Sequence, residues 1–142
     1  MKEMVYTNER KIEVLERNFY KGYEYLIVNY GTHPCCYVAL ESKHPYYGVF
    51  YDNININCHG GLTYSNLGLI NSFTRTTYLS DDYWVVGWDY HHVGDFSGFY
   101  SDKENIALFL NPKKWTTLEL IEECKEFIEQ LDFLVHPERL YA

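Results

Sequence analysis

The chain has 142 residues, of which 46% are hydrophobic and 18% aromatic, and its formal net charge at pH 7 is −8. A chain of this length buries roughly two-thirds of its unfolded surface, which predicts a single domain over residues 1–142. The negative charge disfavours direct binding to nucleic acid, and no apolar run approaches the ~20 residues that span a membrane.

The first residues, Met1–Met4, are not followed by the apolar stretch of a secretory signal, so we expect a cytoplasmic protein. The four cysteines include no CxxC pair. In a reducing compartment we expect them to pack in the core or to bind metal rather than to form disulfides.

The first half of the chain predicts one helix followed by strands. Charged residues alternate with aliphatic ones over residues 8–17, which predicts a short amphipathic helix capped by Asn8. Residues 23–28 and 35–40 are rich in β-branched and aromatic side chains and are predicted to be strands. A strand-like pattern also covers residues 49–59.

Strand alternation assigns the cysteines to faces, because neighbouring residues of a strand point to opposite sides. Cys36 falls on the aliphatic face of its strand and is expected in the core, whereas Cys35 falls on the other face and is available for another role. By the same rule Cys58 points inward and His59 points outward.

The clearest predicted element is an amphipathic helix near the end of the chain. Thr116 and Glu119 have the Thr-x-x-Glu spacing of a capping box, and the helix is expected to end before Pro137. Its apolar residues recur at steps of three and four and form one stripe, made of Leu120, Cys124, Phe127, Leu131 and Leu134.

These elements predict an α+β fold, in which an N-terminal helix and a C-terminal amphipathic helix pack on a small antiparallel sheet and metal stabilises the loops. A further short apolar element is expected over residues 106–110.

Histidine and aspartate residues gather after the apolar run that ends at Trp88. Asp89 falls on the strand face opposite Trp88, and a turn at residues 93–94 is expected to bring His92 and Asp95 together. The pair Gly60-Gly61 either forms a simple turn or lets the backbone pass close to another segment, as a site residue would need.

We predict a zinc site formed by Cys35, His59, His92 and Asp95, because zinc accepts thiolate, imidazole and carboxylate ligands in tetrahedral geometry. His44 is the alternative fourth ligand, and Asp89 is either a ligand or the acceptor that fixes the tautomer of a ligating histidine. The competing interpretation is that each histidine is simply a surface residue or a hydrogen-bonded core residue.

The solvent side of the C-terminal helix is acidic. Such a row either is an ordinary solvated face or imitates a phosphate backbone toward a protein that binds nucleic acid through Lys and Arg. On the second interpretation it is a partner-binding surface, made of Glu119, Glu122, Glu123, Glu126 and Glu129.

Complete catalytic motifs are absent from the sequence. HExxH, the zinc deaminase signature, the Walker loop, the GxSxG elbow and GxGxxG are all missing, so no residue is identified as a general base or nucleophile. The sequence therefore favours a non-enzymatic protein.

Several short motifs resemble those of a family of small proteins encoded by phages and prophages. The resemblance covers about residues 20–135, and its most specific pieces are the HGGLTY motif at His59 and the GWDxxHxGD motif that contains His92. This chain has Trp88 where that family is expected to have Phe. The remaining pieces are Gly22-Tyr23, Cys35-x-Tyr37-Val38, His44-Pro45, Glu123-Cys124 and Gln130-Leu131.

The resemblance implies a host-takeover or anti-defence factor. The expected function is that of an anti-CRISPR inhibitor that binds a type II effector nuclease, or another basic nucleic-acid-binding protein, in the cytoplasm of the host bacterium. It also makes Cys124 an alternative metal ligand besides a core residue. Two other functions stay open: a metal-dependent hydrolase of a nucleotide-like substrate, and a virion or morphogenesis component.

Overall fold

A tight turn at Lys21-Gly22 joins the first two strands of the sheet. Both residues have positive φ, 50° and 83°, which is the geometry of the two-residue hairpin turns that match the right-handed twist of paired strands. In the computed structural model, which describes residues 12–71, 74–92, 95 and 113–138, this turn joins β1 (Glu13–Tyr20) to β2 (Tyr23–Asn29).

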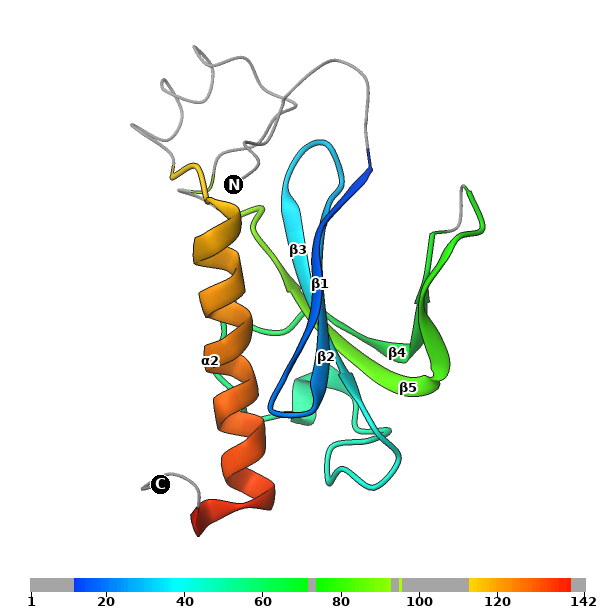
Figure 1. Cartoon of the computed structure of the whole chain (residues 1–142), viewed down its shortest axis with the longest axis vertical. Coiled ribbons are helices and arrows are strands. Elements are labelled where there is room, and N and C mark those ends of the chain that lie inside the picture. The colour runs from blue at the N-terminus through cyan, green and yellow to red at the C-terminus, as the bar shows by residue number, and fades with distance from the viewer. Residues whose placement is uncertain (1–11, 72–73, 93–94, 96–112, 139–142) are drawn as a thin grey trace.

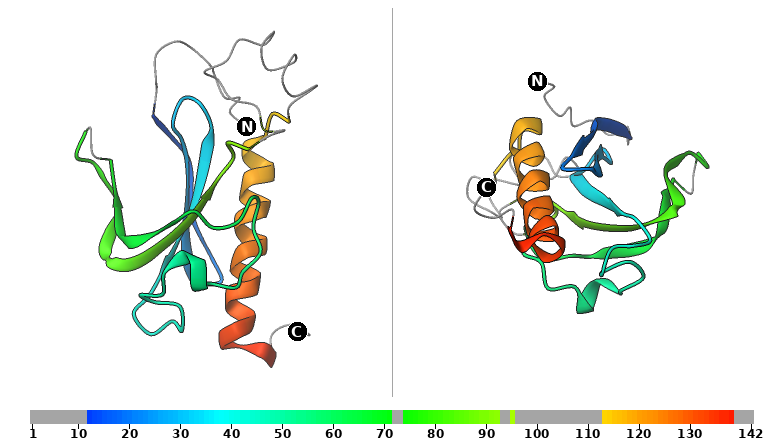
Figure 2. Two further views of the ribbon diagram at one scale, coloured as in Figure 1. Left: turned by 180° about the vertical axis from the view of Figure 1, so that it is seen from behind. Right: turned by 60° about the horizontal axis from the view of Figure 1, so that its bottom comes forward.

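Five antiparallel strands form one sheet in the order β1-β2-β3-β5-β4. The other strands are β3 (Pro34–Leu40), β4 (Tyr64–Ile70) and β5 (Thr77–Asp89), and a short 3-10 turn, η1 (Tyr51–Asn53), lies between β3 and β4. The helix α2 (Thr117–Val135) lies along one face of the sheet, and β4 and β5 curl away from it (Figures 1 and 2).

The central strands β2 and β3 are buried on both faces. Toward α2, the alternating residues of β3 and β5 meet the helix in a core that includes Cys36, Val38, Leu40, Val86, Trp88, Leu120, Cys124, Phe127 and Leu131. The opposite face holds a second cluster, made of Leu26, Val28, Cys35, Tyr37, Leu69, Leu79 and Val85. The predicted placement of Cys36 in the core is confirmed, and Trp88 lies in the same cluster beneath α2.

The predicted helix over residues 8–17 is wrong for residues 13–17, which belong to β1. Their alternation of charged and aliphatic side chains also suits an edge strand, and pairing with β2 decides between the two. Arg17, for example, reaches Glu24 of β2 at 2.7 Å. Asn8 and the apolar element predicted over residues 106–110 lie outside the described residues.

Residues 49–59 do not form the predicted strand, although part of the predicted burial is present. Tyr51–Asn53 forms η1, and residues 54–59 join no strand. Ile54 is nevertheless buried and Cys58 half-buried against the core, as predicted. The backbone of Asn57 pairs with α2 instead of a strand: its N–H donates to Gln130 Oε1 and its carbonyl accepts from Gln130 Nε2, both at 2.8 Å.

The helix α2 begins and ends as its sequence predicts. Thr116 Oγ1 accepts from the backbone N–H of Glu119, and Glu119 Oε1 accepts from that of Thr116, which completes the capping box. The helix ends at Val135, but Leu134 is 46% exposed and so leaves the predicted apolar stripe. In the described part of the chain, no helix combines the length and apolarity needed to cross a bilayer.

We predict that Gln130→Ala lowers the free energy of unfolding by about 1 kcal/mol, because it removes both hydrogen bonds that hold Asn57 against α2. Gln130→Glu keeps the acceptor for the Asn57 N–H and loses only the donor, so it should cost less. Urea unfolding of the three proteins measures the order; equal stability of Gln130→Ala and the parent chain would contradict this role.

Candidate metal centre

The turn after β5 brings His92 and Asp95 together. The backbone N–H of Asp95 donates to the carbonyl of His92 at 2.9 Å, and the backbone N–H of His92 donates to Asp95 Oδ2 at 3.1 Å. Asp89, the last residue of β5, accepts from the N–H of His91 at 3.1 Å and so directs the chain into this turn. The predicted meeting of the two side chains is confirmed.

His59 lies much earlier in the chain, and its side chain contacts the same Asp95 carboxylate. Its Nε2 lies 2.8 Å from Asp95 Oδ2, and its ring stacks on Tyr90 with the centroids 4.6 Å apart and an interplanar angle of 7°. Trp115, just before α2, meets the same ring edge-on at 5.0 Å. Two aromatic contacts therefore fix the orientation of the imidazole.

Asp95 is the centre of the cluster and is only 5% exposed. Its Oδ2 faces His59 Nε2 and His92 Nδ1, the latter at 3.3 Å, while its Oδ1 accepts from Trp115 Nε1 at 2.9 Å. Burial alone would raise the pKa of Asp95, but hydrogen bonds from His59, Trp115 and the backbone of His92 outweigh it and lower the pKa below its ordinary value. The carboxylate is therefore held in its ionised form.

Gly60 allows His92 to enter the cluster. A Cβ at position 60 would lie 2.3 Å from His92 Cε1, and the residue has a φ of 71°, in the region that favours glycine. Gly61 also has positive φ, 84°, but a Cβ there would meet nothing within 4 Å. The glycine pair was expected either to form a simple turn or to let another segment pass close by. Gly60 does the second, because it leaves room for the His92 ring.

His59, His92 and Asp95 form a candidate metal-binding group, since one ligand atom from each lies within 4.8 Å of the other two. In a tetrahedral site with bonds of ~2.0–2.2 Å, ligand atoms are roughly 3.3–3.6 Å apart. The distances of 2.8 and 3.3 Å from Asp95 Oδ2 to the two imidazoles are close to that spacing. The two imidazoles also lie within 4.8 Å of each other through one ligand atom each.

The structure does not bring Cys35 into this group. Cys35 is buried in the cluster on the sheet face opposite α2, whereas His59 stacks on Tyr90, which belongs to the core beneath the helix. Burial raises the pKa of the Cys35 thiol well above its ordinary value, with the charge of Asp89 adding to the effect. Cys35 therefore packs in the cluster on the face opposite α2.

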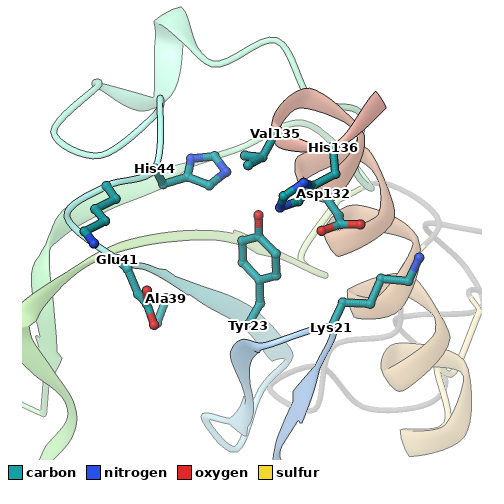
Figure 3. Close-up of a pocket in the computed structure, with 9 residues that line it drawn as sticks. Lys21, Tyr23, Ala39, Glu41, His44, Asp132, Val135 and His136 are labelled. Carbon is teal, nitrogen blue, oxygen red and sulfur yellow. The ribbon is translucent and has the colours of Figure 1, made fainter. Parts of the chain in front are cut away.

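The other alternative ligands also lie apart from the group. His44 lines a cavity of about 220 Å³ at the last turn of α2, beside Val135 and His136 (Figure 3), and its Nδ1 accepts from the N–H of Tyr46 at 3.0 Å. Cys124 is fully buried in the core between α2 and the sheet.

Asp89 lies at the edge of the group rather than inside it. Its Oδ1 is 3.7 Å from His92 Nε2, and its Oδ2 accepts from Thr63 Oγ1 at 3.1 Å. If His92 binds an ion through Nδ1, Asp89 is the carboxylate closest to the remaining N–H, which suits the predicted role in fixing the tautomer.

Trp115 and Tyr90 are the site residues that sequence reasoning missed. Trp115 holds Asp95 Oδ1, and Tyr90 supports the His59 ring. Strand alternation could have predicted the position of Tyr90, because Tyr90 continues the series Trp84, Val86 and Trp88 on one face. The sequence gives no comparable indication for Trp115, because its contact with Asp95 depends on how α2 docks.

No family model, curated protein or solved structure matches this chain.

We predict that Gly60→Ala displaces His92 and weakens metal binding at least tenfold, while Gly61→Ala leaves it within a few-fold. Both variants should lose about 1–2 kcal/mol of stability, because each places a Cβ on a backbone of positive φ, but only Gly60→Ala creates the clash with the imidazole. Calorimetric titration with Zn²⁺ measures the difference, and equal affinities in the two variants would contradict this account.

Proposed function

We propose that this protein binds one divalent transition-metal ion, zinc in the first instance, through His59, His92 and Asp95. The observation that carries the proposal is the convergence of two imidazoles on one buried carboxylate whose second oxygen is already held by Trp115. A nitrogen-rich site with one carboxylate suits zinc, and it also suits iron(II) and other ions of this series.

The ion would act as a crosslink between segments that are far apart in the chain. His59 and Asp95 are separated by 36 residues, and Asp95 and Trp115 by 20. Joining such segments lowers the entropy of the unfolded chain and adds the binding free energy of the ion to the stability of the fold. Holding these segments together requires no catalytic base, in line with the missing catalytic motifs.

Elemental analysis tests the metal directly. We predict one divalent ion per chain, retained in His136→Ala and lost in His92→Ala. A chelator should lower the melting temperature of the parent chain by several degrees, because an ion at about 100 times its Kd contributes about 2.7 kcal/mol. A metal content far below one in the parent chain, with no response to the chelator, would contradict the site.

We further propose that the protein is a phage-encoded, non-enzymatic inhibitor that binds a host defence nuclease of the type II CRISPR effector class. The motifs around His59 and His92 support this reading by resemblance, and the charge of the helix supports it by complementarity with a basic nucleic-acid channel. Glu122 and Glu126 are exposed on α2. The acidic row is partly neutralised at its ends, where Glu119 pairs with Lys113 and Glu129 with Lys21.

Among the described residues no ion pair involves Glu122 or Glu126, so these two positions are the part of the row to test. We predict that Glu122→Lys combined with Glu126→Lys weakens binding to a purified type II effector nuclease at least tenfold and makes the remaining binding less sensitive to salt. Glu41→Lys combined with Asp52→Lys makes the same change of charge at exposed positions outside the helix and should have little effect. Unchanged binding by the helix variant would exclude α2 as the contact surface.

A metal-dependent hydrolase is the second candidate function. One observation favours it: only three donors converge among the described residues, as in catalytic zinc sites where the fourth position holds water.

A further inference from the structure

We propose that the metal at this centre keeps at least one coordination position open to an external imidazole or carboxylate donor. The inference rests on the metal site proposed above and concerns what that site does once loaded. Structural zinc sites are closed by four protein ligands, whereas sites with three protein ligands exchange their remaining position with solvent or substrate.

The first support is the number of donors. Among the described residues, the group whose ligand atoms lie within 4.8 Å of one another has three members, His59, His92 and Asp95. Glu123 of α2 interacts electrostatically with His59 but is not a member of the group. Asp89 lies beside His92 Nε2, which points away from an ion bound at Nδ1.

The second support is the hydrogen bond that holds one oxygen of the Asp95 carboxylate. Asp95 Oδ1 accepts from Trp115 Nε1 at 2.9 Å, and only Oδ2 faces the two imidazoles. A carboxylate held in this way offers one donor oxygen and cannot close the site by binding through both. Trp115 therefore keeps Asp95 monodentate.

The third support is access. The side chains of His59 and His92 are 26% and 34% exposed, in contrast to 4% for Asp95. Gly60 and Gly61, which follow His59 directly, are exposed and carry no side chains. A Cβ at Gly61 would enter open space. An external donor can thus reach an ion from the histidine side, while Asp95 and Trp115 form its floor.

The charge and the donor preference of the ion determine which ligands can occupy its open coordination position. An ion held by two neutral imidazoles and one carboxylate keeps a net positive charge and accepts nitrogen and oxygen donors. Imidazole and carboxylate side chains are the commonest such donors on a protein partner, so the ion would form part of the surface that the partner contacts.

Substitution with Co²⁺ gives a visible spectrum that reports the ligands of the ion. We expect the full-length chain to bind one Co²⁺, and we expect imidazole and acetate, added separately, to shift the visible bands with one-site saturation. Trp115→Phe should still bind Co²⁺ but respond to imidazole several-fold more weakly, because Asp95 is then able to bind through both oxygens. Glu123→Gln should respond like the parent chain.

Three results would overturn the inference. A one-to-one Co²⁺ complex whose spectrum ignores imidazole and acetate would mean a closed site and would leave the proposed metal binding intact. If Glu123→Gln alone opened such a site to imidazole, Glu123 would be the fourth ligand. Failure of the folded chain to bind Co²⁺ or Zn²⁺ at all would remove both the metal site and the open position.

Discussion

The hydrogen bonding of the buried Asp95 carboxylate is the interaction on which the arrangement of the candidate metal centre depends. It accepts from His59, from His92 and from Trp115, and so joins the segment after η1, the turn after β5 and the approach to α2. An ionised carboxylate removed from water requires such partners, because burial without them costs several kcal/mol. The same partners that satisfy the charge also present two imidazoles to one oxygen, so the group is prepared for a cation.

The rest of the fold supplies the rigidity that this centre needs. The sheet places Asp89 and Tyr90 at the end of β5, where Tyr90 donates its backbone N–H to the carbonyl of Pro34 at 3.1 Å. Gln130 holds the segment that leads to His59 against α2, and the capping box fixes the start of the helix beside Trp115. Each of these contacts is local and modest in energy, yet together they determine the positions of the three donors.

Much of this could be predicted from the sequence, because strand alternation and capping patterns are local. Strand alternation placed Cys36 in the core and Trp88 on the face opposite Asp89, and the Thr116–Glu119 spacing located the start of α2. The same rules failed where a pattern had two solutions: residues 13–17 alternate in a way that suits an edge strand as well as a helix. Strand alternation also placed Cys35 on the face opposite Cys36, but it could not reveal that Cys35 is buried there in a second cluster. Trp115 depended on tertiary docking alone.

The close packing of Gly60 against His92 also constrains how the two positions can change over evolutionary time. Hydrogen is the only substituent at position 60 that leaves room for an imidazole ring at position 92. A lineage that replaces this histidine by a small residue would release the glycine, whereas a lineage that first replaces the glycine would lose the ring from the cluster. Paired variation at these two positions would therefore mark descendants in which the candidate metal site has been lost.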